Sequence, residues 1–162
     1  MKSLLITISL ILTWGLNSVE NHKLLLEYAQ NSERFITYNL VGESDDCYLQ
    51  AENGHGEISL LFISQEAEEV RGYQSKSKII LQVTKEKIIQ DAQLIQSKDT
   101  PSYVKRIKRS NFFQQFVGWN GKSEIKAVTG ATITCNAVET TIANMLERIN
   151  KITLISEEDW QP

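Results

Sequence analysis

The chain has 162 residues, of which 41% are hydrophobic and 23% charged. This composition is that of one globular domain and excludes a disordered, collagen-like or coiled-coil protein. Its formal net charge of −3 lacks the basic excess typical of proteins that bind duplex nucleic acid, so no nucleic-acid partner is expected. The two cysteines, Cys47 and Cys135, show no spacing typical of zinc, dithiol or haem sites, and we expect no metal site.

The first 18 residues have the pattern of an export signal. A short positive start at Met1-Lys2-Ser3 precedes an apolar run, Leu4 to Trp14, which small and polar residues follow. The pattern favours a cleaved signal peptide, with an uncleaved membrane anchor and a buried N-terminal helix as the alternatives. Signal or anchor would place the domain outside the cytoplasm, in the periplasm or at the cell surface. There the two cysteines either form a disulfide or remain thiols.

The remaining chain predicts one α+β domain over residues 22–155, with a small antiparallel sheet flanked by helices. Apolar spacing predicts an amphipathic helix over 22–40 that turns near Asn31. Alternating and β-branched residues predict strands, and a helix is expected after Pro101, which suits a first helical turn. The predicted strands are 47–49, 57–63, 78–84, 88–96 and 124–128, with 78–84 and 88–96 forming a hairpin.

A threonine-rich turn lies between the last predicted strand and a helix that reaches about Ile149. Val128 to Thr134 supplies three threonine hydroxyls, one glycine and a helix N-terminus, a combination that suits a phosphate group. Asn136 and Glu139 have the spacing of a capping box, which supports a helix start here. On these residues alone, a well-capped turn without a ligand is the favoured interpretation.

Three motifs resemble those of the FMN-binding domain family. Thr129-Gly130-Ala131-Thr132, followed by Ile133 and Thr134, is similar to its flavin-attachment motif. Gly72-Tyr73 before the hairpin, and Asp99-Thr100-Pro101 before a helix that leads to the Phe112–Phe116 aromatic run, occur in the family's order. The resemblance covers about residues 47–149. The family includes the G subunit of the Rnf electron-transport complex, the C subunit of the sodium-pumping NADH:quinone reductase, and regulators of nitrous oxide reduction.

The resemblance implies FMN joined through its phosphate to Thr132 by a dedicated flavin transferase. It implies an exported electron carrier that serves a membrane redox complex or another electron-transfer protein, rather than a stand-alone enzyme with catalytic residues of its own. The remaining cofactor-binding residues that it implies are Thr129, Gly130, Ala131, Ile133, Thr134, Asp99, Thr100, Pro101 and Tyr73.

Lys126 departs from the family pattern, because the attachment motif usually has aspartate at this position. The departure leaves a second hypothesis, a family member that has lost covalent attachment and acts as a binding or sensory module. A third hypothesis is an exported scaffold domain without flavin. A basic cluster on the predicted helix, with Lys105, Arg106, Lys108 and Arg109, is interpreted as a solvated face, a contact with anionic lipid or a docking site for an acidic redox partner.

Overall fold

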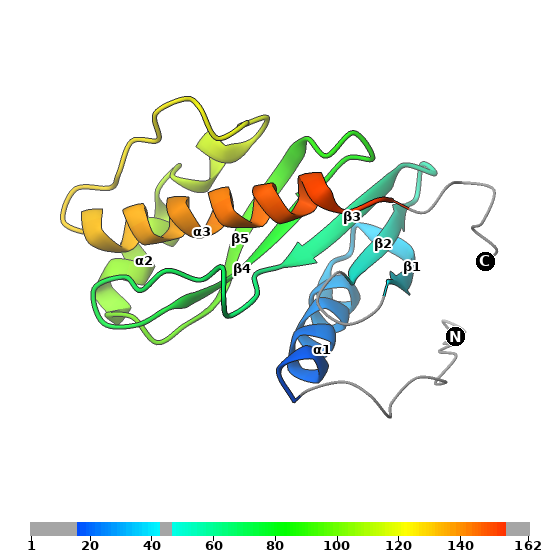
Figure 1. Cartoon of the computed structure of the whole chain (residues 1–162), viewed down its shortest axis with the longest axis horizontal. Helices are drawn as coiled ribbons and strands as arrows, with labels where there is room; N and C mark the ends of the chain where they lie inside the picture. The colour runs from blue at the N-terminus through cyan, green and yellow to red at the C-terminus, as the bar shows by residue number, and fades with distance from the viewer. Residues whose placement is uncertain (1–15, 43–46, 155–162) are drawn as a thin grey trace.

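A five-stranded antiparallel sheet forms the centre of the protein (Figure 1). The structure, a computed structural model, describes residues 16–42 and 47–154. The strands lie side by side in the order in which they occur along the chain, each paired with the next. They are β1 (Phe35–Val41), β2 (Tyr48–Asn53), β3 (Ile58–Ile63), β4 (Ser77–Val83) and β5 (Ile89–Ser97).

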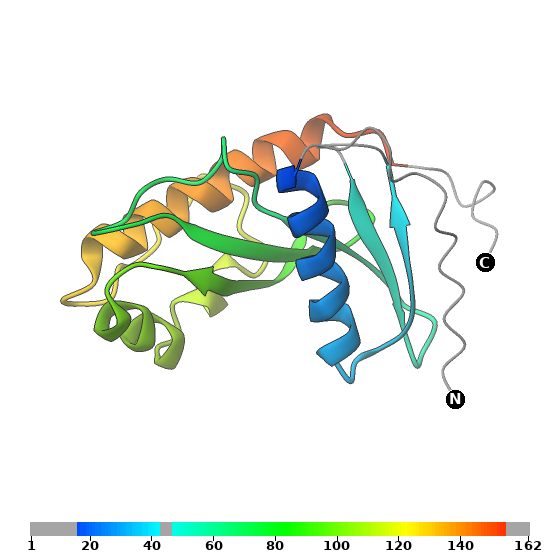
Figure 2. The same cartoon turned by 90° about the horizontal axis from the view of Figure 1, so that it is seen from below.

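Helices cover both faces of this sheet because its central strands are apolar on both sides. On one face, Phe62, Leu81 and Leu94 belong to the larger core, which includes the long helix α3 (Thr132–Lys151). On the other face, Leu61 and Ile80 pack with residues of α1 (Leu16–Asn31). Figure 2 shows α1 lying across one face of the strands while α3 runs along the opposite face. The sheet therefore separates two apolar cores.

Two short elements complete the larger core between β5 and α3. The helix α2 (Pro101–Arg109) begins at the proline predicted to start it, and the 3₁₀ turn η2 (Phe113–Phe116) follows. The rings of Phe112, Phe116 and Trp119 meet edge to face, with centroids 5.3 Å apart in each successive pair. Since such aromatic contacts add to simple burial, they hold the connection between α2 and the sheet firmly in place.

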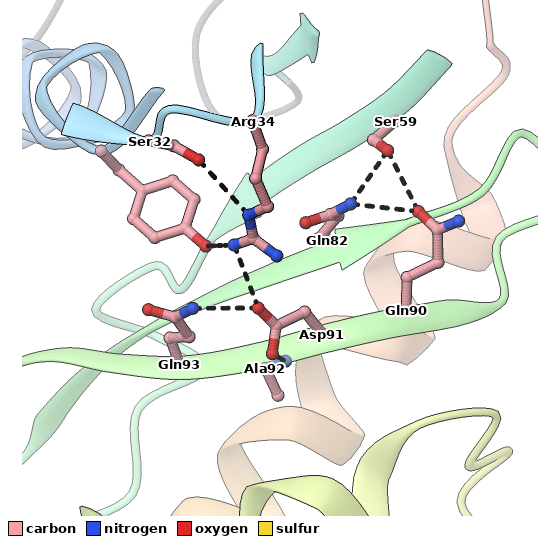
Figure 3. A network of polar contacts seen from close by, with 9 residues as sticks. Ser32, Arg34, Ser59, Gln82, Gln90, Asp91, Ala92 and Gln93 are labelled. Atoms are coloured by element: carbon pink, nitrogen blue, oxygen red, sulfur yellow. Dashed lines mark hydrogen bonds and ion pairs between the residues drawn. The ribbon is translucent and has the colours of Figure 1, made fainter. Parts of the chain in front are cut away.

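A polar network links α1, the turn before β1 and β5 (Figure 3). Arg34, just before β1, donates to the Tyr28 hydroxyl of α1 at 3.2 Å and to Asp91 of β5 at 3.4 Å. Asp91 also accepts a hydrogen bond from Gln93 at 2.9 Å. These contacts join α1 and the turn before β1 to the last strand, β5, on the face of the sheet on which α1 lies.

The predicted α+β class, the 78–84 and 88–96 hairpin, and the helices after Pro101 and Ala131 are confirmed. The single helix predicted over 22–40 is wrong in its second half, because α1 ends at Asn31 and Phe35–Val41 is strand β1. β1 is an edge strand in which only Phe35 is buried, so its sequence lacks the alternation of a half-buried strand.

The short strand predicted over 124–128 is also wrong, because no neighbouring strand pairs with this segment. Its backbone bonds instead to a side chain. The Lys126 N–H donates to Gln115 Oε1 at 2.9 Å, and Gln115 Nε2 donates to the Lys126 carbonyl at 3.1 Å. The Gln115 side-chain amide thus bonds the backbone N–H and carbonyl of Lys126, which a neighbouring strand would otherwise bond.

The disulfide considered between Cys47 and Cys135 is absent, and both cysteines are buried thiols. Cys47 contacts His22 of α1, whereas Cys135 belongs to the core beneath α3. The two cysteines therefore belong to contacts on opposite faces of the sheet.

Most of the predicted signal or anchor, residues 1–15, lies outside the described residues. Its last three residues, 16–18, begin α1. Among the helices in the described part of the chain, none has the length and apolar content needed to cross a membrane.

Truncation of a core side chain tests this packing. Leu81 of β4 is fully buried, so Leu81→Ala should lower the free energy of unfolding by about 2–5 kcal/mol. Ile88→Ala, at a side chain that is 52% exposed, is the matched control and should change it by less than about 0.5 kcal/mol. Urea unfolding of both variants measures the difference, and equal losses would contradict the assigned core.

Candidate functional site

The carboxylate of Asp99, just after β5, lies where three segments of the chain meet. Asp99 is 3% exposed and accepts four hydrogen bonds. Oδ2 accepts from the Tyr73 N–H at 2.9 Å and from the Thr134 hydroxyl at 2.8 Å. Oδ1 accepts from the N–H groups of Gln74 at 2.9 Å and Thr100 at 2.7 Å. One side chain thus joins the loop before β4, the start of α2 and the first turn of α3.

These hydrogen bonds determine the charge of Asp99. Burial alone raises the pKa of its carboxyl, but the donors from Thr100, Thr134, Gln74 and Tyr73 stabilise the carboxylate and hold its pKa below the ordinary value. Asp99 is therefore a buried anion at neutral pH, and its charge is compensated by N–H and O–H groups rather than by a cation.

Gly72 allows the loop before β4 to approach this carboxylate. A Cβ atom at residue 72 would overlap Asp99 Oδ2, so a larger residue would displace either the loop or the Asp99 carboxylate. The Gly72 N–H donates to the Ser75 carbonyl at 2.8 Å, which closes a tight turn around Tyr73. Glycine therefore fits at position 72 because the Asp99 carboxylate leaves no room for a side chain there.

The same loop is fastened along α3 by three side chains of the helix. The Thr141 hydroxyl accepts from the Val70 N–H at 3.0 Å, and Asn144 Nδ2 donates to the Glu68 carbonyl at 2.9 Å. Arg148 Nε donates to the buried Glu68 carboxylate at 2.6 Å. Because the loop is held at both ends, Tyr73 has a defined position beside the start of α3.

The turn that leads into α3 has the backbone that its glycine permits. Gly130 has a φ of +76°, and the Ala131 N–H donates to the Val128 carbonyl at 2.9 Å. Arg106 of α2 donates from Nη1 to the Thr129 carbonyl at 2.9 Å. A Cβ atom at Gly130 would overlap that guanidinium, so Arg106 lies directly against the turn.

The N-terminus of α3 has no side-chain cap. The helix starts at Thr132 after an Ala131 N-cap, and its first i to i−4 bond runs from Cys135. The capping box predicted from Asn136 and Glu139 is therefore wrong, since Asn136 lies within the helix. The N–H groups of residues 132–134 have no partner in the described part of the chain. They give this helix end a positive character that suits an anion.

The structure places the predicted site residues in different environments. Thr129, Gly130 and Thr132 are exposed, whereas Ala131 is buried and the Thr134 hydroxyl is used by Asp99. The side chains of Ile133 and Tyr73 are 57% and 53% exposed. Two exposed threonine hydroxyls, those of Thr129 and Thr132, therefore remain on the turn.

The start of α2 contributes a buried hydroxyl without a partner. Thr100 Oγ1 is inaccessible to solvent and makes no hydrogen bond to the described residues, while Pro101 begins the helix and is exposed. Tyr103, one turn further, meets the Tyr73 ring edge to face with centroids 5.4 Å apart. Of the aromatic residues at or near the motifs, Tyr73 and Tyr103 thus border the site, whereas Phe112 and Trp119 are buried in the core.

Two residues in these contacts were not singled out as site residues by the sequence. Arg106 belongs to the basic cluster, for which the sequence leaves three interpretations open, and Gln115 belongs to the Phe112–Phe116 aromatic run. Arg106 holds the turn before Thr132, and Gln115 holds the backbone of Lys126. Neither spacing nor composition predicts these contacts, because both cross between segments that only the fold brings together.

Replacement of Asp99 tests its joining role. Asp99→Asn removes the charge that four donors stabilise and should lower the free energy of unfolding at pH 7 by about 1.5–3 kcal/mol. The pKa of Asp99 is lower in the folded than in the unfolded protein. The stabilisation that the charged carboxylate gives the folded state is therefore complete above the unfolded-state pKa of about 4. This stabilisation is lost as the pH falls through the folded-state pKa. The difference in the free energy of unfolding between wild type and variant should therefore shrink there.

Urea unfolding between pH 7 and pH 3 measures this difference. Glu33→Gln, at an exposed position, is the control and should stay within about 0.5 kcal/mol of wild type. A difference for Asp99→Asn that does not change with pH would contradict the assigned role of the charge.

Comparison with known proteins agrees with this geometry. Residues 72–147 match the family model described as FMN-binding domain, and no curated protein sequence matches the chain. The matched segment begins at Gly72 and ends in α3, so it contains Asp99, the turn at Gly130 and Thr132. The elements α1 to β3 precede it and complete the same sheet. Residues 72–147 of this chain therefore match the FMN-binding domain family, and FMN is the cofactor that this match supports.

Proposed function

We propose that this protein is an exported electron carrier whose FMN is ester-linked through its phosphate to Thr132. The observation that carries the proposal is the position of Thr132. Its side chain is exposed at the uncapped N-terminus of α3, within the family's matched segment. A phosphate on this hydroxyl would lie at the positive end of a 20-residue helix.

The residues around Thr132 fit a phosphodiester. The three unpaired N–H groups of residues 132–134 are donors for its oxygens, and the Arg106 guanidinium lies against the same turn. The linked phosphate retains one negative charge, which a helix N-terminus stabilises by about 0.3–1 kcal/mol at an exposed site. These N–H donors and the Arg106 guanidinium already lie at the turn, so no buried side chain has to move for them to surround the phosphate.

The residues around Asp99 fit the remainder of the cofactor. The unpartnered Thr100 hydroxyl is a donor or acceptor for a polar group, and Tyr73 and Tyr103 offer aromatic faces. Ile133 adds an exposed apolar side chain next to the attachment residue. When bound, FMN supplies the redox chemistry, while these residues hold and orient it.

A covalent link is consistent with export, because a carrier outside the cytoplasm loses any cofactor that dissociates. An unaided threonine hydroxyl is a weak nucleophile, so a flavin transferase must install the ester. The apolar N-terminal run supports export, and a membrane redox complex or another electron-transfer protein is the proposed partner.

Lys126 supports a second candidate function, a noncovalent binding or sensory module. Its side chain is exposed at the position where the attachment motif usually has aspartate. A transferase that requires a carboxylate there would leave Thr132 unmodified. The backbone of Lys126 is nevertheless held by Gln115, so the segment keeps its course into the turn without that carboxylate.

Substitution of the attachment residue tests the main proposal. Each variant is co-expressed with a flavin transferase, and covalent flavin is measured by fluorescence of the denatured band and by intact mass. Thr132→Ala should abolish the label, because the hydroxyl that forms the ester is removed. Thr140→Ala, at another exposed threonine of α3, is the control that should keep it. Label retained in Thr132→Ala would refute the assignment.

Lys126→Asp separates the two candidate functions. If the transferase accepts the natural sequence, as we propose, the wild type is loaded and the substitution leaves the loaded fraction unchanged. A wild type without covalent flavin and a loaded Lys126→Asp variant would instead favour the noncovalent module. Intact mass of both proteins after co-expression distinguishes these results.

A further inference from the structure

Charge is distributed unevenly along this chain. Residues 98–132 contain seven of the 17 Lys and Arg residues but two of the 20 Asp and Glu residues. This segment therefore carries a formal charge of +5, and the rest of the chain carries −8. A protein that is acidic overall thus has one strongly basic segment, and that segment leads directly to Thr132.

Most of this positive charge lies on one helix beside the site. The basic face of α2, which comprises Lys105, Arg106, Lys108 and Arg109, is exposed. The apolar residues of α2, by contrast, pack into or against the core. Figure 1 shows α2 and the first turn of α3 at the same end of the molecule. The bond from Arg106 to the Thr129 carbonyl places the basic face against the flavin-attachment turn.

Nearby carboxylates do not neutralise this face. In the described part of the chain, Lys105, Lys108 and Arg109 form no ion pair. Of the two acidic residues in the segment, Asp99 is buried and already accepts four hydrogen bonds, which leaves Glu124 as the exposed one. The positive potential of the face is therefore available to a partner.

The basic face suits an acidic protein better than a lipid surface. A helix that lies in a membrane interface needs an exposed apolar side, and the large exposed apolar residues of this protein include none on α2. Two of them, Tyr73 and Ile133, flank the proposed flavin site instead. Apolar side chains next to exposed positive charge are the arrangement expected of a transient protein interface with a charged rim.

We propose that the basic face of α2 is the docking surface for a redox protein with an acidic surface, which it guides to the flavin beside Thr132. The inference rests on the proposed function and adds the chemistry of the partner. Charge complementarity of this kind raises association rates by about 10 to 1,000-fold at low ionic strength, and the gain falls as salt is added.

The electron-transfer test uses two small oxidants of opposite charge. Photoreduced, flavin-loaded protein is mixed in a stopped-flow instrument with ferricyanide, an anion, or with hexaammineruthenium(III), a cation. The test variant replaces Lys105, Lys108 and Arg109 by Glu and keeps Arg106 on its turn. The control replaces Lys23, Lys85 and Lys151 by Glu, which changes the net charge equally on α1, on the β4–β5 turn and at the far end of α3.

In the test variant, reoxidation by ferricyanide should slow by about tenfold at low ionic strength, and reoxidation by the cation should accelerate. The control variant should change either rate much less. Equal changes in the two variants would overturn the inference, because the net charge rather than the basic face would then set the rates. Absence of flavin would contradict the proposed function and leave the second test to decide the docking surface.

The second test does not need flavin. Unloaded protein, labelled with ¹⁵N, is titrated with poly-L-glutamate and separately with phosphatidylglycerol vesicles. Amide shifts confined to α2 and residues 129–133, lost in the test variant and kept in the control, would support the docking surface. Absence of shifts there, or binding to the vesicles without binding to poly-L-glutamate, would overturn it.

Discussion

The proposed flavin site depends on one buried carboxylate, that of Asp99. Asp99 fixes three segments that are distant in sequence, because each supplies a donor to the same two oxygen atoms. Its burial makes these bonds strong, and an unpaired charge in that position would be costly. The loop with Tyr73, the start of α2 and the first turn of α3 consequently keep a fixed arrangement. Thr132 is exposed because Thr134, two residues later, is directed inward to Asp99.

This constraint also links the site to the wider fold. α3 carries the uncapped turn at one end, and along its length Thr141, Asn144 and Arg148 fasten the loop that delivers Tyr73. β5 ends next to Asp99 and thereby connects the proposed site to the sheet. The family match starts within this loop, so the matched segment contains the Asp99 contacts, the hairpin β4–β5 and most of α3. The preceding strands and α1 cover the sheet's other face.

Much of the fold could be predicted from local sequence signals. The hairpin β4–β5 follows from β-branched alternation, and α2 follows from Asp99-Thr100-Pro101. β1 could not be predicted, because an exposed edge strand has no buried face to impose a period. Residues 124–128 have the composition of a strand, but the Gln115 side chain occupies the place of a partner. The sequence motifs point to the residues proposed for the site, whereas the contacts of Arg106 and Asp99 depend on segments that only the fold brings together.

Mass spectrometry of one peptide tests most directly whether Thr132 carries the flavin. Full-length protein co-expressed with a flavin transferase can be digested with trypsin, and the peptide of residues 127–148 fragmented in a mass spectrometer. This peptide contains all five candidate threonines from Thr129 to Thr141. We predict a mass increase of one FMN less water, with fragment ions that assign it to Thr132. An unmodified peptide, or the same increase assigned to another threonine, would contradict the account.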